Sequence, residues 1–203
     1  MQFSKIRQTL IIRLPQIRLP QGGLLLMALA FVMISVQSAA AQSRGFIKEN
    51  DMVDGARSGS VGIMERGYIE GLSPNLRSRD GEPVIVIGAE AGHANVVQYL
   101  IYRKARLDER GSSGHTALTA AAARGHVEIM KLLLEGGADI DKTGVRKEVP
   151  IIIAAREGHY EAVKLLIEKD AYLEDTDLTG RTALDWARES RNRDLIQLLE
   201  GAQ

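Results

Sequence analysis

Short apolar blocks alternate with polar, glycine-containing stretches along residues 48–203. The clearest block, VEIMKLLLE at 127–135, has a broad apolar face at the spacing of an amphipathic helix. We predict a second short helix, ALTAAAAR, just before it, because Thr116 is a good N-cap and Gly125 can end a helix in the left-handed conformation. The polar stretch IDKTGVRKE at 140–148 predicts a projecting loop. The predicted unit is therefore helix, turn, helix and loop.

This unit returns every 33 residues. Glycine, histidine and alanine recur at that spacing, as Gly59, Gly92, Gly125 and Gly158, as His93, His126 and His159, and as Ala105, Ala138 and Ala171. The second helix of a unit is apolar on both flanks and cannot bury this surface alone. A fixed period of this length is typical of repeat proteins, in which each unit packs on its neighbours. The period therefore predicts a row of stacked units.

Two of the first helices have an ambiguous local signal. PVIVIGA at 83–89 and VPIIIAA at 149–155 are rich in β-branched residues and would favour strands if taken alone. We predict helices, because the 33-residue register places both segments at the first-helix position and tertiary packing overrides local propensity. Pro83 and Val149 stand where Thr116 stands in the clearest unit, so these helices lose a capping hydrogen bond, each worth about 1 kcal/mol.

These motifs resemble the ankyrin repeat, with its T-P-L-H-x-A-A helix start, its G-H between helices, its L-L-L second helix and its G-A-D-x-N exit. Clear copies occupy 82–108, 115–141 and 148–174. Weaker copies occupy 51–75 and 181–203, and the last one carries Arg191 and Asn192 in place of G-H. The resemblance implies an all-α solenoid of about five stacked helix-turn-helix units with projecting hairpins, at about 48–79, 80–112, 113–145, 146–178 and 179–203.

The N-terminal segment has a different character. Basic residues precede 15 uncharged residues, GGLLLMALAFVMISV at 22–36, and Ala39 and Ala41 have the spacing of a cleavage site. We predict a signal peptide at 1–41, cleaved after Ala41, and a repeat domain at 42–203. The apolar stretch is shorter than the roughly 20 residues of a typical membrane span. An uncleaved inner-membrane anchor that leaves the repeats in the periplasm is the alternative, and a mitochondrial transit peptide is a third interpretation.

Composition excludes several classes of function. The 203 residues include no cysteine, so disulfides, thiolate metal sites and cysteine nucleophiles are excluded. The chain has 26 basic and 26 acidic side chains, of which four basic and no acidic ones lie in residues 1–41. Subtracting four leaves 22 basic against 26 acidic side chains, a formal charge of −4 for the mature chain. Nucleic-acid binding needs a basic footprint, so we predict no nucleic-acid partner.

The three in-register histidines suggest a metal site. Equivalent residues of stacked helices lie about 8–10 Å apart, whereas zinc ligands converge on one ion at about 2.0–2.3 Å. We predict instead that each of these histidines hydrogen-bonds the neighbouring backbone, and that His115, in a predicted loop, is solvated. Ser112 and Ser113 lie near His115 in sequence, but that loop has nothing to hold a triad geometry. No catalytic residue, metal or cofactor is predicted.

The positions that the repeat does not require are candidates for partner contact. The resemblance implies that loop tips and the exposed side of the first helices form a concave binding surface. One row precedes each Gly-His pair, a second row precedes the small residue of each first helix, and the loops add basic residues. The candidate contacts from these three sets are Ile87, Glu90, Arg110, Ala123, Arg124, Arg146, Ile153, Arg156, Glu157, Arg181, Trp186 and Glu189. The second row either forms an apolar stripe in the groove or packs between units, and the first row is equally compatible with a solvated helix face.

The sequence therefore predicts a non-catalytic protein–protein interaction module in the periplasm or outside the cell. It would bind a protein partner of unknown identity through the concave face and the loop tips. Two alternatives are a membrane-anchored scaffold held by residues 22–36 and a hydrolase on an unusual solenoid. The basic middle loops favour a partner with an acidic edge.

Overall fold

A computed structural model describes residues 47–202 of the chain. The predicted signal peptide at 1–41, its cleavage site and the alternative anchor lie outside the described residues. The described part contains five pairs of α-helices: α2 (Glu49–Ser58) with α3 (Val61–Ile69), α4 (Val84–Glu90) with α5 (Ala94–Tyr102), α6 (Ala117–Arg124) with α7 (Val127–Glu135), α8 (Pro150–Arg156) with α9 (Tyr160–Glu168), and α10 (Ala183–Glu189) with α11 (Arg193–Glu200). Each predicted unit holds one of these pairs, so the predicted all-α class is confirmed.

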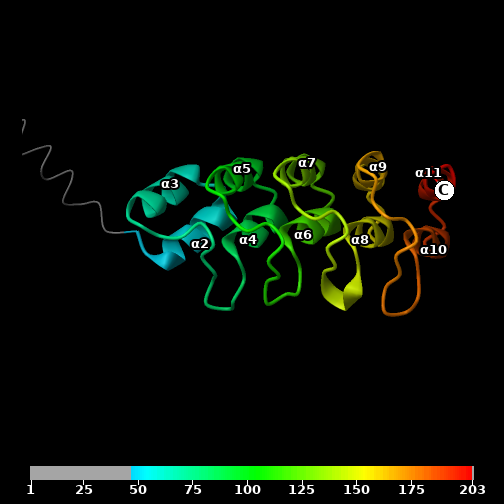
Figure 1. Ribbon diagram of the computed structural model, residues 1–203, viewed down its shortest axis with the longest axis horizontal. Helices are drawn as coiled ribbons and strands as arrows, with labels where there is room; N and C mark the ends of the chain where they lie inside the picture. Colours follow the sequence, from blue (N-terminus) through cyan, green and yellow to red (C-terminus); the bar gives the residue numbers. More distant parts are fainter. Residues whose placement is uncertain (1–46, 203) are drawn as a thin grey trace, which may run out of the picture. The chain divides into compact units, whose positions relative to one another are not determined.

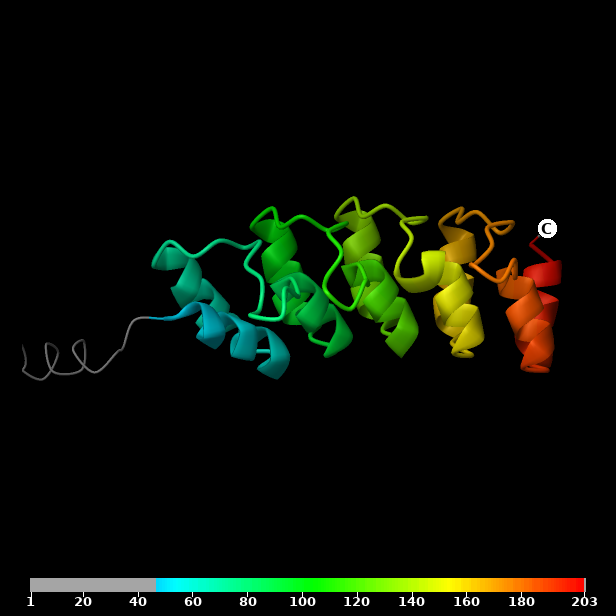
Figure 2. The same cartoon turned by 90° about the horizontal axis from the view of Figure 1, so that it is seen from below.

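The helix pairs stack side by side in sequence order. The first helices of the pairs form one row and the second helices form another (Figure 1). Hairpin-like loops project from the row of first helices, and the same loops are seen from below in Figure 2. One of them contains a short 3-10 helix, η1 (Val145–Lys147). Within residues 47–202 the only bridge of β type joins Arg77 and Pro83.

In the row of first helices, a helix with small side chains packs between helices with larger ones. Helix α6 is rich in alanine, and it contacts α4 on one side and α8 on the other. Its neighbours bury β-branched side chains almost completely, among them Val86 at 1% and Ile152 at 0% exposure. The two segments that locally favour strands are therefore helical, because in this register their branched side chains fill the space beside α6. Burying an aliphatic side chain of this size stabilises by about 1.5–3 kcal/mol.

Each histidine that opens a second helix is bonded to the preceding repeat. The Nε2–H of His93 donates to the backbone carbonyl of Arg57 at 2.8 Å. In the same way His126 donates to the backbone carbonyl of Glu90 at 3.3 Å, and His159 to that of Ala123 at 3.2 Å. The predicted backbone role of these histidines is confirmed. Within residues 47–202, no three His, Cys, Asp or Glu side chains are grouped so that they could hold a metal ion.

The glycine before the histidine is needed for two reasons in the second and third repeats, at Gly92 and Gly125. Gly125 has φ +66°, in the left-handed region that other residues avoid. A Cβ atom on Gly125 would also lie only 2.7 Å from Nδ1 of His159 in the next repeat. The Gly-His pair therefore joins neighbouring repeats, since the glycine of one leaves room for the imidazole of the next.

The loops after the second helices form another contact between repeats. The side chains of Asn75, Asp108 and Asp141 each accept a hydrogen bond from a backbone N–H 31 residues further along the chain, at 2.7, 3.0 and 3.1 Å. These side chains fix the spacing of successive loops on one edge of the row.

No helix among residues 47–202 has the length and apolar character needed to cross a bilayer.

Candidate binding surface

The first helices and the hairpins that precede them form a surface that we call the inner face. Its hairpins are at about 77–82, 110–115, 143–148 and 176–181. The predicted contacts fall into three groups on it. Glu90, Arg110, Arg124, Arg146, Glu157 and Glu189 are exposed, Ala123, Arg156, Arg181 and Trp186 are half-buried, and Ile87 and Ile153 are buried. The structure therefore brings most of the predicted residues to one side of the molecule, but does not leave all of them accessible.

Of the two interpretations of the second row, an apolar stripe in the groove or packing between units, the stripe is wrong for the first three members. Ile87 is 7% exposed, Ala120 is 3% exposed and Ile153 is fully buried. Neighbouring first helices lie close enough for these side chains to fill the space between repeats, so the packing interpretation holds for them. A partner could reach them only by separating the repeats.

Trp186, the last member of that row, is partly accessible and held by several groups. Its Nε1–H donates to Asp177 Oδ2 at 3.0 Å. The guanidinium carbons of Arg181 and Arg156 lie 4.7 and 5.9 Å from the centre of its ring, within the range of a cation–π interaction. An indole ring held by a hydrogen bond and by two nearby cations is a suitable anchor for a partner, because it loses little conformational entropy on binding.

Asp177, a buried loop residue, organises this end of the inner face. Its Oδ1 accepts from the backbone N–H groups of Thr179 and Arg181 and from the Thr179 hydroxyl at 2.6–3.1 Å. Burial opposes ionisation, but these donors and the Trp186 N–H outweigh it and lower the pKa of Asp177. The carboxylate therefore stays charged and fixes both the hairpin and the indole.

Two columns of residues, one at the base of each hairpin and one at the end of each first helix, meet across the inner face. In the fourth repeat the buried Glu148 pairs with Arg156, and in the fifth Arg181 pairs with Glu189 at 2.7 Å. The two pairs occupy the same register with their charges exchanged. Burial lowers the pKa of Arg156, but the carboxylates of Glu148 and Glu157 together raise it more, so the net change is upward. In the C-terminal half of the inner face, an ion pair therefore connects each hairpin to the first helix that follows it.

The N-terminal half of the inner face lacks such pairs within a repeat. The equivalent positions are Glu82 and Glu90 in the second repeat, and His115 and Ala123 in the third. Glu90 pairs instead with Arg124 of the next repeat at 2.8 Å, and both side chains remain at least half exposed. The 33-residue register could have identified Glu82 and Glu148 in advance, because they share a column with Arg181.

His115 is not the solvated loop residue that the sequence predicts. Its ring is half-buried, and Nδ1 is enclosed without a hydrogen-bond partner. Burial lowers the pKa of His115, although Glu90, Glu82 and Glu148 oppose this shift. The hydroxyls of Ser112 and Ser113 both donate to Glu82 at 2.9 Å, not to the imidazole of His115. This loop therefore has the hydrogen bonds of a structural turn.

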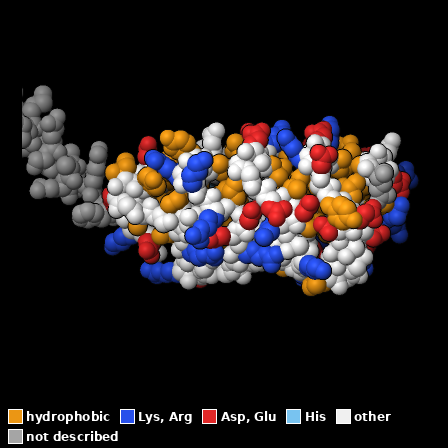
Figure 3. Space-filling model, viewed as in Figure 1, with side chains coloured by type: hydrophobic (Ala, Val, Ile, Leu, Met, Phe, Trp, Pro, Cys, Tyr) orange, Lys and Arg blue, Asp and Glu red, His pale blue; other side chains and the backbone are white. Residues whose placement is uncertain are grey.

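The hairpin tips are linked to one another and carry basic residues. Arg77 donates to the carbonyl of Arg110 at 3.1 Å and pairs with Glu109 at 2.8 Å, while Arg110 donates to the hydroxyl of Thr143. Arg146 is exposed at the tip of the third hairpin, with φ +54°. Lysine and arginine side chains stand over the hairpins along the lower edge of Figure 3. The tips therefore form a connected and partly basic edge.

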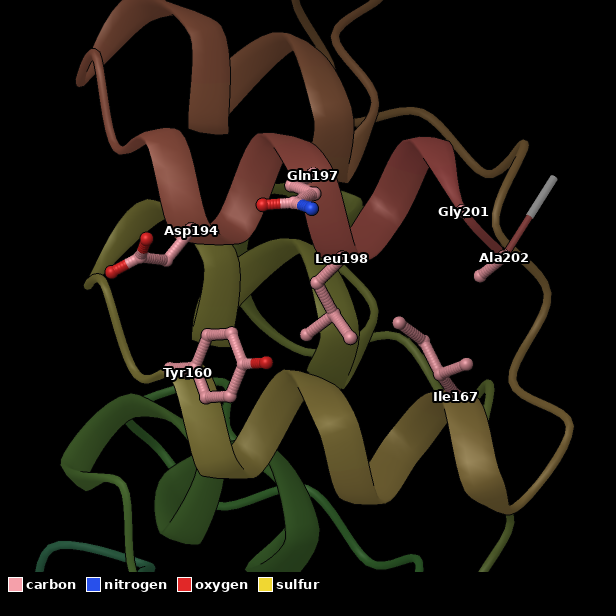
Figure 4. Close-up of a pocket in the computed structure, with 7 residues that line it drawn as sticks. All are labelled: Tyr160, Ile167, Asp194, Gln197, Leu198, Gly201 and Ala202. Atoms are coloured by element: carbon pink, nitrogen blue, oxygen red, sulfur yellow. The ribbon is translucent and has the colours of Figure 1, made fainter.

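A large hollow lies elsewhere, between the second helices α9 and α11. It has a volume of about 750 Å³ and is wide open to solvent. Tyr160 and Ile167 of α9 face Asp194, Gln197 and Leu198 of α11 across it (Figure 4). None of the predicted contact residues lines this hollow, so it is not part of the inner face.

The comparison with protein families agrees with this architecture. The family model described as "Ankyrin repeats (3 copies)" matches residues 54–144 and 142–203. The two matches together cover well over half of the chain. A search of curated proteins found no match.

Proposed function

The chain belongs to the ankyrin-repeat family, and on that premise we propose that it is an exported binding module whose inner face holds a protein partner. Ankyrin repeats are generally protein–protein interaction modules and are typically non-catalytic. Curved stacks of repeats bind partners over extended surfaces, where each repeat contributes a few side chains. The proposal therefore concerns which side chains of this chain make the contact.

The observation that carries the proposal is the set of inner-face side chains that packing does not require. Arg124, Glu157 and Glu189 are exposed at the ends of first helices, and Arg146 is exposed at a hairpin tip. Trp186 is half-buried, and the guanidinium groups of Arg181 and Arg156 lie within cation–π range of its ring. Tryptophan and arginine are enriched among the residues that dominate binding energy. A rigid aromatic anchor surrounded by charged groups favours a polar protein surface as the partner.

We propose further that the partner presents an acidic edge to the hairpin tips. Arg110, Arg146 and Lys147 supply positive charge there, and all three are exposed. Attraction between exposed charges accelerates association and is screened by salt. The rate constant for association is therefore expected to fall as ionic strength rises, and a rate that does not change with salt would contradict the acidic edge.

Export to the periplasm or beyond is proposed from the N-terminal segment. N-terminal sequencing of the protein recovered from cells tests it. A mature chain that starts at Gln42 supports an exported soluble module. A chain that keeps residues 22–36 and fractionates with the membrane supports the anchored scaffold instead.

The partner can be sought by crosslinking a tagged chain in cells and identifying what co-purifies. The informative variant carries Arg124→Ala, Arg146→Glu and Glu157→Ala, three exposed positions of the inner face. Arg156 is left unchanged because its loss would strand the buried carboxylate of Glu148. A matched control carries Lys131→Ala, Lys164→Glu and Glu168→Ala, which are exposed on the outer helices α7 and α9 and change the net charge equally.

Both triple variants should keep the helical circular dichroism of the parent chain, because every changed side chain is exposed. We expect one protein to be captured by the parent and the control and to be lost from the inner-face variant. Capture that persists in the inner-face variant and disappears in the control would place binding on the outer helices and refute the proposal.

A further inference from the structure

The second helices of the first two repeats, α3 and α5, carry an exposed surface that neither packs between repeats nor belongs to the inner face. We call it the tyrosine–arginine patch, and it consists of Arg66, Tyr68, Ile69, Tyr102, Arg103 and Lys104. Ile69 is 76% exposed and Tyr102 is 73% exposed, the two highest values among the large hydrophobic residues of the described chain. Figure 3 shows hydrophobic and basic side chains side by side over α3 and α5.

The patch is held together by Arg103. Its guanidinium carbon lies 3.9 Å from the centre of the Tyr68 ring, and 5.1 and 5.4 Å from those of Tyr99 and Tyr102. The Nε–H of Arg103 also donates to the Tyr99 hydroxyl at 3.1 Å. Because Tyr68 belongs to α3 and Arg103 follows α5, this cluster joins two repeats into one continuous surface.

The patch is amphipathic and carries a net positive charge. Arg66 lies one turn before Ile69 on the same face of α3, and Lys104 follows Arg103 directly. Two acids, Glu65 and Glu70, lie on α3 or directly after it, and Glu70 accepts a hydrogen bond from the backbone N–H of Ile47 at 2.6 Å. Tyrosine, exposed aliphatic and basic side chains together are the combination that suits the boundary between water and an anionic lipid surface.

The hydrogen bond between Ile47 and Glu70 shows where the chain enters the repeat domain. Ile47 is tied to Glu70, next to Ile69 of the patch. Only ten residues, 37–46, separate Ile47 from the uncharged stretch 22–36. Even a fully extended chain spans no more than about 3.6 Å per residue, so this link reaches roughly 35 Å at most. While residues 22–36 lie in a bilayer, as a signal segment in transit or as an anchor, the patch stays close to the lipid surface.

We propose that, in a chain that keeps residues 22–36, the tyrosine–arginine patch rests on the anionic lipid surface into which those residues insert. Three basic side chains and three apolar ones bind lipid weakly by themselves, but a short tether keeps their effective concentration high. The hairpins project from the opposite row of the domain (Figure 1). The patch would therefore orient the domain so that the inner face points away from the lipid, towards a protein partner.

The absence of cysteine from the chain permits a direct test with single-cysteine variants of the full chain. Ile69→Cys and Tyr102→Cys are labelled with an environment-sensitive fluorophore and reconstituted into vesicles of phosphatidylcholine with phosphatidylglycerol. Tyr172→Cys and Leu178→Cys serve as controls, because these side chains are 58% and 71% exposed on other repeats. We expect nitroxide-bearing lipids to quench the patch labels several-fold more than the control labels.

Charge reversal tests the lipid chemistry. Arg66→Glu with Lys104→Glu, in the Ile69→Cys chain, should abolish the difference in quenching, whereas Lys131→Glu with Lys164→Glu on α7 and α9 should leave it intact. Vesicles of phosphatidylcholine alone should give the low quenching of the charge-reversed chain. Equal quenching at all four labels would overturn the proposal. A change in the fluorescence of the patch labels that appears only when a second protein is added, and not with lipid, would also overturn it. These results do not depend on the crosslinking experiment, which reports on the inner face.

Discussion

Four of the five first helices of this domain begin in one of two different ways. Helices α6 and α10 begin with threonine caps, since Thr116 accepts from the backbone N–H of Thr119 and Thr182 accepts from that of Asp185, both at 3.2 Å. Helices α4 and α8 begin after Pro83 and Val149, which make no side-chain capping bond. All four helices nevertheless start at the same place in the 33-residue register, so a cap is not what defines the helix start.

The third residue of each helix shows what replaces the cap. In the capped helices this residue is Thr119 or Asp185, whose side chain hydrogen-bonds back to the capping threonine. In the uncapped helices it is Val86 or Ile152, and both side chains are buried. The same position is thus stabilised either by local hydrogen bonds or by packing against the neighbouring repeat. Helices of the second kind depend more on their neighbours.

The largest effect is expected from the uncapped helix α8. Ile152→Ala should lower the free energy of unfolding by about 2–5 kcal/mol, because it removes a fully buried side chain and leaves a cavity. Ile152→Val, which removes one methylene, should cost about 0.5–1.5 kcal/mol. Urea unfolding followed by circular dichroism measures both. Equal losses for the two variants would show that cavity formation is not the cause.

A smaller effect is expected at the cap of α6. Thr116→Ala should lower the free energy of unfolding by about 1–2 kcal/mol, because the backbone N–H of Thr119 loses its acceptor in a buried setting. Thr116→Ser keeps the hydroxyl oxygen and should retain most of the stability. The same urea titration checks this. If the serine variant is as unstable as the alanine variant, then the methyl group matters more than the hydrogen bond.

The cap of α10 should respond to pH, whereas the cap of α6 should not. Hydrogen bonds from the backbone N–H and the hydroxyl of Thr182 lower the pKa of Asp185 below its ordinary value of about 3.9. Because the folded state favours the carboxylate, this contribution to stability is present above that ordinary value and is lost as the pH falls through the lower folded value. In urea titrations at decreasing pH, Asp185→Asn should remove part of the acid sensitivity. Identical pH profiles for the two chains would contradict this role.

The smallest effect concerns His115, which precedes the cap of α6. Burial holds its pKa below the ordinary value of about 6.5, so the unfolded chain binds a proton more readily than the folded one. This penalty is absent above about pH 6.5 and grows as the pH falls towards the folded pKa. His115→Gln should therefore make stability less dependent on pH between neutrality and about pH 5, while Thr116→Ala should not. A His115→Gln chain with the parent's slope in this range would argue against the burial of the ring.

Much of the fold can be predicted because neighbouring repeats use the same register. The role of His126, the helical state of 149–155 and the missing caps at Pro83 and Val149 all follow from placing one copy beside the next. The candidate surface is less predictable. Glu90 and Arg124 were predicted as separate contacts, yet they form a pair between two repeats.

The sequence by itself determined the period, the helix pairs and the bonds between equivalent positions, since a repeated register states which residues are neighbours. Only the tertiary structure decided accessibility, because the exposure of a side chain depends on the size of the residues around it. Ile153 is buried and His115 is half-buried for this reason. The contact of Tyr68 with Arg103 likewise joins positions that are not equivalent in the repeat, and no periodic pattern could have indicated it.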